Sequence, residues 1–318
     1  MQEAVETAFD RNTTAEEIAS QCDLTGKNII ITGANSGLGL ESARVLGAAG
    51  ASITLAVRNI EAGAQAVAEL EKQTGLRNFQ ASALDLASKD SIHAFASRYL
   101  QANNHLDVLL SNAGIMGVQE AYIDGLESQM AVNFLGHFLL SALLAPLLKS
   151  TPDSRVVTLT SIAHRLADVD FDDFNFEKTP YHPMLAYGRS KTATALLAVA
   201  LDERLAPFGV TSLAVHPGVI HETGLNRSMD EKTISMIAAR ADGSEKSVET
   251  GSATSVWAVT SEALRGKGGL YLEDCQVAEL RDNPDFRTGV LPHALSPEAA
   301  NRLWAQAEQW LSHSYDLS

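Results

Sequence analysis

The stretch Lys27-Asn-Ile-Ile-Ile-Thr32-Gly33-Ala-Asn-Ser-Gly37-Leu-Gly39 decides the fold of this chain of 318 residues. The apolar run that ends at Thr32 predicts a buried parallel strand, and Leu38 to Ala49 predicts a helix. A strand, a glycine turn and a helix in that order place unpaired N–H groups and the positive end of the helix dipole where a pyrophosphate can bind. The glycines permit the turn and a close approach of backbone to ligand. An ordinary strand-to-helix turn is the alternative.

Two residues much farther along, Tyr187 and Lys191 in Tyr187-Gly-Arg-Ser-Lys191, point to acid–base chemistry. Four residues make about one helical turn, so the phenol and the ammonium share one helix face. The ordinary pKa of a tyrosine, about 10, is too high for good acid–base catalysis near neutrality. A neighbouring ammonium favours the phenolate, so we expect Lys191, together with a bound cofactor and the helix field, to lower the pKa of Tyr187. Beside the glycine turn, this pair predicts redox chemistry on a bound dinucleotide.

The glycine spacing, Gly33-x-x-x-Gly37-x-Gly39, differs from the Gly-x-Gly-x-x-Gly pattern of many dinucleotide-binding folds. It resembles that of single-domain short-chain dehydrogenases/reductases. The resemblance covers about residues 10–312 and continues, in the family's order, through Asp85-Leu86, Asn112-Ala113-Gly114, Asn133, Ser161, Tyr187, Lys191 and Pro217-Gly218. Finer features are similar to the retinol dehydrogenase-like and WW domain-containing oxidoreductase-like branch: Thr13-Thr14-Ala15, Arg58-Asn59, His137-Phe138 and the tail from Ser296 to Trp304.

The resemblance implies four catalytic residues. Tyr187 would be the acid/base, Ser161 would hydrogen-bond the substrate oxygen, Lys191 would also hold the cofactor ribose, and Asn133 would place a water in the proton path. It further implies cofactor contacts from Gly33, Asn35, Ser36, Gly37, Leu38, Gly39, Arg58, Asn59, Asp85, Leu86, Asn112, Ala113, Gly114, Tyr187, Lys191, Pro217, Gly218, Val219, Ile220 and Thr223. Two positions depart from the family pattern: Ser111 replaces an asparagine, and Thr223 stands one residue later than usual.

The end of the second strand indicates which nicotinamide cofactor is used. A site for NAD usually has an acid where Val57 stands, to accept a hydrogen bond from the ribose 2′-hydroxyl. The next residue, Arg58, instead offers a planar guanidinium that can pair with a 2′-phosphate and stack on adenine. The sequence therefore predicts NADP as the cofactor, with NADPH preferred over NADH. An arginine that merely closes the strand is the alternative.

Apolar runs alternate with helical stretches along most of the chain, which predicts a doubly wound α/β fold of the Rossmann type. We expect a mostly parallel, seven-stranded sheet with helices on both faces, from the runs 28–32, 52–57, 79–84, 106–110, 155–160, 210–215 and 269–273. Without a linker, 1–318 would be a single dinucleotide-binding catalytic domain with extensions at 1–25 and 276–318.

Each extension has helix signals of its own. Thr13 and Thr14 each stand three residues before a glutamate, which predicts a capped helix from about Ala15 to Gln21. Near the other end, Ser296 and Pro297 would begin a helix whose apolar face packs on the chain's own sheet rather than on a partner. That face consists of Leu303, Trp304, Ala307, Trp310 and Leu311.

Charge and cysteine usage bound the surroundings of the protein. With 24 basic and 39 acidic residues the net charge is −15, which disfavours nucleic acid as a partner. The apolar stretch Phe134–Leu148 is interrupted by polar residues and falls short of a membrane span, so we expect a buried or subunit-contact helix. The first residues lack the features of a signal peptide, and Cys22 and Cys275 predict free thiols of a reducing compartment. A soluble, cytoplasmic protein without a membrane anchor is expected.

The substrate is the least defined part of the prediction. The segment between Ser161 and Tyr187 would wall the pocket together with Met116, Val118 and residues 219–240, and an apolar wall favours an apolar ketone, aldehyde or alcohol. The expected aromatic members of that wall, and their neighbours, are Phe171, Phe174, Phe176, Pro180 and Tyr181.

Other function classes are less favoured by the sequence. The spacing of His164, His216 and His221 matches no metal-site motif, so no metal is expected. Serine hydrolysis is disfavoured because the sequence contains no Gly-x-Ser-x-Gly elbow. A non-catalytic NADPH-binding sensor and a scaffold protein are the alternatives to an enzyme. Residues 124–150 and 184–208 should be long helices with exposed apolar faces, which predicts a homodimer or homotetramer.

Overall fold

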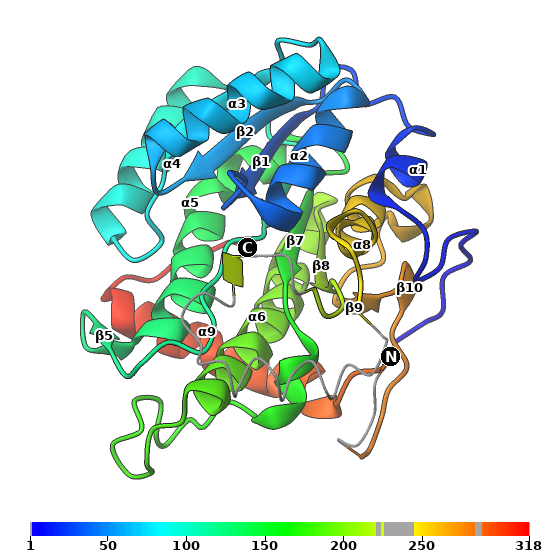
Figure 1. Cartoon of the computed structure of the whole chain (residues 1–318). Coiled ribbons are helices and arrows are strands. Elements are labelled where there is room, and N and C mark those ends of the chain that lie inside the picture. Colours follow the sequence, from blue (N-terminus) through cyan, green and yellow to red (C-terminus); the bar gives the residue numbers. More distant parts are fainter. Residues whose placement is uncertain (1, 221–223, 226–244, 284–287, 318) are drawn as a thin grey trace.

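A computed structural model describes residues 2–220, 224–225, 245–283 and 288–317 of the chain (Figure 1). Within these residues eight strands form one sheet in the order β10-β9-β8-β7-β4-β1-β2-β3. Seven of them are parallel: β1 (Asn28–Thr32), β2 (Ser52–Val57), β3 (Phe79–Ala83), β4 (Val108–Ser111), β7 (Arg155–Leu159), β8 (Thr211–His216) and β9 (Leu270–Glu273). They coincide with the seven predicted runs, so the predicted fold class is confirmed.

The eighth strand was not predicted. The short β10 (Gln276–Val277) pairs antiparallel with β9. The two residues between them, Asp274 and Cys275, have φ of 50° and 58°, the left-handed values of a tight hairpin turn. A second small hairpin, β5 (Tyr122–Ile123) with β6 (Leu126–Glu127), stands apart from the main sheet.

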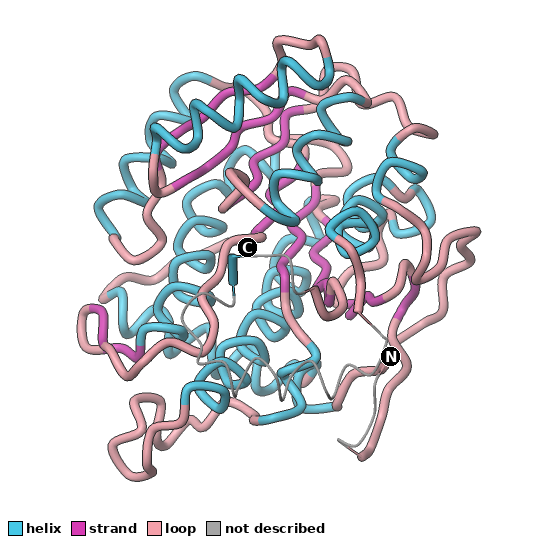
Figure 2. Tube along the Cα trace, in the orientation of Figure 1, coloured by secondary structure: helices cyan, strands magenta, loops and turns pink. Residues whose placement is uncertain are grey.

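Helices cover both faces of the sheet, as Figure 2 shows. Side chains of α1 (Ala15–Ala19), α2 (Gly37–Ala48), α3 (Ile60–Thr74) and α8 (Val248–Thr260) share one apolar core with Ile29 and Ile31 of β1. Those of α4 (Lys89–Ala102), α5 (Gly136–Ser150), α6 (Pro183–Leu205) and α9 (Pro297–Leu311) share another with Ile30. Neighbouring side chains of a strand point to opposite faces, so β1 is apolar throughout because both of its faces are covered.

Short helical turns complete the described chain. A π-helical turn, η1 (Met130–Leu135), runs directly into α5. The other turns are of the 3₁₀ type: η2 (Ile162–Leu166), η3 (Ala206–Phe208), η5 (Glu262–Leu264) and η6 (Pro292–Leu295). Of these, η1 and η2 matter most for function, because they contain or follow residues that the sequence places at the site.

Both predicted terminal helices are present. At the first, Glu17 N–H donates to Thr14 Oγ1 at 3.2 Å and Thr14 N–H donates to the Glu17 carboxylate at 2.7 Å, a reciprocal capping box. The helix ends at Ala19, two residues before the predicted Gln21. At the second, Ser296 Oγ accepts from Ala299 N–H at 3.2 Å.

The last helix, α9, packs against helices of the same chain and not directly on the sheet. The ring of Trp304 meets that of Phe138 edge to face, with centroids 4.5 Å apart. The Arg204 guanidinium lies 4.1 Å from the Trp304 ring centroid, and Trp310 contacts Phe174 at 4.7 Å between centroids. The tryptophans therefore pack within the chain's own core, as predicted, but Trp304 contacts residues of α5 and α6 and not the sheet.

This packing overturns the expectation of exposed apolar faces on the two long helices. The first begins after the small hairpin and runs from Met130 to Ser150, and 83% of its most apolar window is buried. At 21 residues it has the length and composition of a membrane span, longer than the predicted Phe134–Leu148, but the burial is that of a core helix. The second, α6, is likewise buried along most of its length. Their apolar side chains face the sheet and α9.

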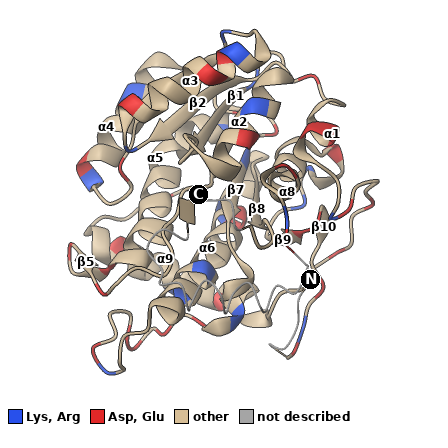
Figure 3. Ribbon diagram, viewed as in Figure 1, with Lys and Arg blue, Asp and Glu red and all other residues tan. Residues whose placement is uncertain are grey.

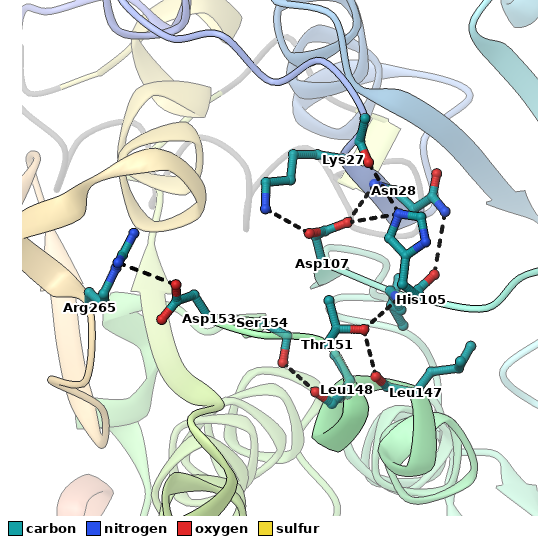
Figure 4. Close-up of polar contacts among 12 residues, drawn as sticks. Lys27, Asn28, His105, Asp107, Leu147, Leu148, Thr151, Asp153, Ser154 and Arg265 are labelled. Carbon is teal, nitrogen blue, oxygen red and sulfur yellow. Dashed lines mark hydrogen bonds and ion pairs between the residues drawn. The ribbon is translucent and has the colours of Figure 1, made fainter.

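Hydrogen bonds and an ion pair join the amino-terminal ends of neighbouring strands, at the end of the sheet opposite to the carboxyl ends of the strands (Figure 4). Asp107 accepts from Asn28 N–H at 2.8 Å and from Lys27 Nζ at 2.9 Å. Thr151 Oγ1 accepts from Leu106 N–H at 3.0 Å. Since Lys27 is half exposed, the ion pair contributes about 1 kcal/mol or less, and the backbone bonds matter more.

Charged residues of both signs are interspersed over the outer helices and loops in the view of Figure 3. One such cluster fastens the N-terminal helix to the body of the protein. Arg44 on α2 pairs with Glu16 on α1 and with Glu41 on its own helix, each at 2.8 Å. The α1 helix is thereby held beside α2, the helix that follows the glycine turn.

Candidate active site

A cleft of about 1420 Å³ opens at the carboxyl ends of the central strands. In the sheet order β1 lies between β4 and β2, so the connections that leave β1 and β4 diverge to opposite sides. Such a switch point is where open α/β sheets bind their ligands. The volume exceeds the roughly 300–1,000 Å³ of an ordinary small-molecule site, so there is room for a dinucleotide and a substrate together.

The glycine turn forms one end of this cleft. Gly37, with φ of 56°, takes a left-handed conformation that other residues adopt only at a cost. A Cβ on Gly39 would stand 2.5 Å from Asn112 Nδ2, so only glycine allows this approach. Ser36, which precedes α2, makes no side-chain cap, so the first N–H groups of that helix stay available to an anion. This geometry is compatible with the predicted phosphate contact, which stays a prediction.

The ends of β1 and β4 are joined by side-chain bonds at the cleft floor. Asn112 Nδ2 donates to the Thr32 carbonyl at 2.8 Å, and Ala113 N–H donates to Thr32 Oγ1 at 2.9 Å. Thr32 Oγ1 also lies 3.0 Å from Nε2 of the buried His137. These bonds fix the predicted Asn112-Ala113-Gly114 segment, all of which lines the cleft.

Tyr187 and Lys191 lie on α6, and both line the cleft from buried positions. Lys191 Nζ is 5.6 Å from the Tyr187 ring centroid and donates to the Leu159 carbonyl at 2.8 Å. Ser161, two residues after the end of β7, lines the cleft as well. Three of the four predicted catalytic residues thus meet in one place.

The protonation of this group depends on burial. Burial raises the pKa of Tyr187 to about 12, and the influence of the Ser161 side chain only partly opposes this. Burial also lowers the pKa of Lys191 to about 8. Desolvation of the buried phenol dominates without a ligand, and the ammonium donates to the Leu159 carbonyl, so the lowering expected from Lys191 together with a bound cofactor stays a prediction.

Asn133, the fourth predicted catalytic residue, does not line the described part of the cleft. Its Oδ1 accepts from Ile115 N–H at 2.8 Å, and its Nδ2 donates to the Ile115 carbonyl and to Ser190 Oγ, each at 2.9 Å. His137 Nδ1 lies 2.8 Å from the Asn133 carbonyl. The side chain thus joins Ile115 to Ser190, and its role in placing a water stays a prediction.

The predicted adenosine end of the cleft is assembled around Arg58. Its side chain is exposed and lines the cleft, and the described residues offer its guanidinium no hydrogen bond or ion pair. Asn59 lines the cleft too, although its Oδ1 caps α3 by accepting from Ala62 N–H at 2.9 Å. Asp85 and Leu86 lie in the same lining. An unpaired guanidinium at this position is free to bind an anion.

The predicted aromatic wall is wrong. Among residues that the structure describes, Met116 does line the cleft, but Val118, Phe171, Phe174, Phe176, Pro180 and Tyr181 do not. They pack behind it: the Arg189 guanidinium lies 4.1 Å from the Phe176 ring centroid, and Phe174 contacts Trp310. The predicted segment between Ser161 and Tyr187 does line the cleft, but through apolar residues that the sequence did not single out. They are Ile162, Leu166, Met184 and Leu185, and Ile115 lies beside them in the lining. They lie on loops or helix ends without a motif, so no sequence signal marks them.

A charged region at the far end of the cleft was also not predicted. Lys246 Nζ lies 2.5 Å from Asp274 Oδ1, and Glu273 accepts from Gly289 N–H at 2.6 Å. Burial raises the pKa of Glu273 to about 7. Arg165 lines the same region. The cleft is therefore apolar near Met116 and Met184 and polar beyond β9.

The segment after β8 is described only in part. Pro217, Gly218, Val219 and Ile220 line the cleft as predicted, together with Gly224 and Leu225 of the predicted 219–240 wall. The predicted cofactor contact Thr223, like His221, lies outside the described residues. Its role stays a prediction.

His164 and His216, which the sequence analysis considered as metal ligands, are buried and hydrogen-bonded to the backbone. His164 Nε2 accepts from Leu291 N–H at 3.1 Å, and its Nδ1 lies 2.9 Å from the Ser161 carbonyl. His216 Nδ1 accepts from Ile162 N–H at 3.3 Å. Burial lowers the pKa of His164 to about 4 and that of His216 to about 3. Both are neutral near pH 7 and position the loops on either side of Ser161 and Pro217.

Comparison with known proteins agrees with this geometry. The family model for short chain dehydrogenases matches residues 27–234. The chain is 40% identical over 292 residues to a "Probable oxidoreductase" of Streptomyces antibioticus, which covers 89% of this chain and 96% of the relative. It is also 40% identical over 275 residues to the WW domain-containing oxidoreductase of Gallus gallus, covering 84% of this chain and 66% of the relative. A solved structure of an uncharacterized protein from Mycobacterium paratuberculosis is 31% identical with a TM-score of 0.72, covering 96% and 99%.

Proposed function

We propose that this chain, which belongs to the short-chain dehydrogenase family, transfers a hydride between NADP(H) and an apolar carbonyl or alcohol substrate. Family membership establishes the coarser activity, that of an oxidoreductase acting on CH–OH or C=O groups. The finer proposal rests on one observation: Tyr187, Ser161 and Lys191 line a single cleft that begins at the uncapped N-terminus of α2.

Each residue has a role that its position allows. A bound nicotinamide dinucleotide would supply the hydride acceptor or donor. The N-terminus of α2 would hold the cofactor pyrophosphate, and Lys191 would hold the ribose. Tyr187 would give its proton to the substrate oxygen, and Ser161, which lines the same cleft, would donate a second hydrogen bond to that oxygen.

The raised pKa of Tyr187 determines which form of the phenol is present before a ligand binds. With a pKa of about 12 the phenol carries its proton at neutral pH, which is the form that a reduction consumes. Alcohol oxidation needs the phenolate instead. Lowering the pKa from there toward 7 would demand about 7 kcal/mol, at roughly 1.4 kcal/mol for each unit. The charges of Lys191 and of an oxidised nicotinamide would both have to contribute.

The preference for NADPH is supported by Arg58. Its exposed guanidinium lines the cleft at the end of β2, and the carboxylate that would select NAD is replaced by the buried Val57. A guanidinium without another partner can pair with a 2′-phosphate through two hydrogen bonds.

Several broader expectations belong to the same proposal. Residues 1–318 would act as one catalytic domain in the cytoplasm. A homodimer or homotetramer would have to use a face other than the one on α5 and α6 that α9 covers. A non-catalytic NADPH sensor or a scaffold is less favoured, because Tyr187 and Lys191 are both present in the cleft.

The decisive experiment is a panel of aldehydes, ketones and alcohols followed by the absorbance of the reduced nicotinamide, with NADPH and NADH compared. We expect NADPH-dependent reduction of apolar carbonyl compounds. If the protein binds NADPH but none of the carbonyl compounds in the panel causes its oxidation, the result would favour the non-catalytic sensor.

A further inference from the structure

We propose that Gln129 is a positioning residue that sets the shape of the substrate end of the cleft and so helps to determine specificity. The proposal rests on the proposed function, since it concerns how that site selects a substrate. Gln129 is fully buried and does not itself line the cleft. Its influence is exerted through two chain segments that do.

The side chain of Gln129 bonds to both of these segments. Its Oε1 accepts from Gly117 N–H at 2.9 Å. Its Nε2 donates to the Pro183 carbonyl at 2.9 Å and to the Tyr181 hydroxyl at 3.2 Å. A backbone N–H only donates and a backbone carbonyl only accepts, so these partners determine which way the amide points.

The joined segments carry the side chains that meet the substrate. Gly117 follows Met116, and Pro183 stands between His182 and Met184; all three of these neighbours line the cleft. Gly117 and Pro183 are 66 residues apart in the sequence, and the small β5–β6 hairpin lies between them along the chain. Gln129 therefore links two parts of one wall, and its side-chain bonds to Gly117, Pro183 and Tyr181 are called the clasp below.

Further hydrogen bonds, from Tyr181 and to Glu127, support the clasp. The Tyr181 hydroxyl accepts from Gln129 and shares its one proton between the Val118 carbonyl at 3.0 Å and the Glu127 carboxylate at 3.3 Å. Glu127 in turn accepts from Gln129 N–H at 3.0 Å. Tyr181 and Val118 thus shape the wall although they do not line it.

The clasp predicts an effect on large substrates in particular. Without it, the segments at Met116 and Met184 are no longer fixed relative to each other, while Tyr187, Ser161 and the glycine turn keep their own bonds. A small carbonyl compound that contacts only the catalytic residues should be reduced as before. A long apolar one that fills the wall should lose uniform binding, which raises KM and leaves kcat nearly unchanged.

The experiment compares Gln129→Leu and Tyr181→Phe with wild type on a series of aldehydes of increasing chain length. Gln129→Leu should raise KM for the longest aldehyde about tenfold, as expected for lost hydrogen bonds, with NADPH affinity unchanged. Tyr181→Phe keeps the ring and should produce a smaller change in the same direction. Asn78→Leu is the matched control, because Asn78 donates to Gly47 and Ala51 carbonyls far from the cleft.

A measurement without turnover separates this proposal from the proposed function. In protein labelled with ¹³C at its methionine methyls, Gln129→Leu should shift the resonances of Met116 and Met184, and Asn78→Leu should not. If wild type reduces no aldehyde but these resonances shift, the proposed function fails and the clasp stands. Unshifted resonances in a folded Gln129→Leu protein, or an equal rise of KM for short and long aldehydes, would overturn the clasp.

Discussion

The ammonium of Lys191 donates a hydrogen bond of 2.8 Å to the carbonyl of Leu159, the last residue of β7. This bond ties α6 to the sheet beside Ser161, and it holds the charge 5.6 Å from the centre of the Tyr187 ring. Lys191 therefore has a structural partner before any ligand binds. Its ammonium makes no direct bond to the phenol one helical turn away, so any effect on Tyr187 would be exerted through charge.

Lys191→Ala should lower both turnover and cofactor affinity, because one side chain carries the charge near the phenol and would also hold the ribose. Loss of a charged hydrogen bond to the cofactor corresponds to about tenfold or more in its Kd. Fluorescence titration with NADPH, run beside kcat, checks this. A variant that loses turnover at unchanged NADPH affinity would contradict the ribose role.

Tyr187→Phe should leave cofactor binding intact and reduce kcat by about 10²–10⁴-fold, the usual contribution of a general acid. The ring and its packing remain, and only the proton that the substrate oxygen receives is lost. The measurement is kcat on the best carbonyl compound from the panel, with NADPH affinity as the control. Wild-type kcat in this variant would mean that the phenol is not the acid.

Arg58→Asp should reverse or abolish the preference for NADPH. A carboxylate would repel the 2′-phosphate and could accept from the 2′-hydroxyl of NADH, and one charge-assisted hydrogen bond is worth about tenfold or more in affinity. Kd values for NADPH and NADH in both proteins decide the point. If NADPH binds the two proteins equally well, another residue reads the phosphate.

The protein should lose stability in mild acid because of its buried histidines. The pKa values of His137, His164 and His216 are lowered by burial to about 4, 4 and 3, below the 6.5 of the unfolded side chain. Their contribution is therefore present above pH 6.5 and is lost as pH falls toward these values. At pH 5 each of these histidines lowers the free energy of unfolding by about 2 kcal/mol relative to its value above pH 6.5, at roughly 1.4 kcal/mol for each pKa unit. Glu273, with its raised pKa, partly opposes the loss.

Urea unfolding at pH 8, 7, 6 and 5 tests this, with His164→Phe beside wild type. The variant should be less stable at pH 8, since Leu291 N–H loses its acceptor, but should lose about 2 kcal/mol less between pH 7 and 5. His93→Phe, at an exposed position, is the matched control. Equal pH dependence in all three proteins would show that the buried histidine is not responsible.

Trp304→Ala should destabilise the fold by about 3–5 kcal/mol, the usual cost of deleting a large buried aromatic side chain. It removes the contacts with Phe138 and Arg204 and uncovers part of α5 and α6. Urea unfolding measures the loss, and light scattering shows whether the uncovered face associates. Unchanged stability would mean that α9 is not part of the core.

The sequence by itself determined the sheet and the glycine turn at one end of the cleft. The strand that ends at Thr32, the glycine turn and the helix from Gly37 onward need only local spacing, because neighbouring residues decide whether a turn is sharp and a helix end is free. The Tyr187–Lys191 pair is local too, since one helical turn brings the two side chains to one face. The capping boxes and the cofactor end belong to the same class of short-range signal.

Only the tertiary structure decided the substrate wall, the contacts of Asn133, the cover on α5 and the protonation of Tyr187. Phe171 and Phe174 have the composition of a pocket wall, but they pack against α9, which is more than 120 residues farther along the chain. Gln129 carries no motif, and its partners near Gly117 and Pro183 become neighbours only when the chain is folded. The pKa of Tyr187 depends on how completely the fold removes water from the phenol, a property of the whole packed environment that no spacing of residues along the chain records.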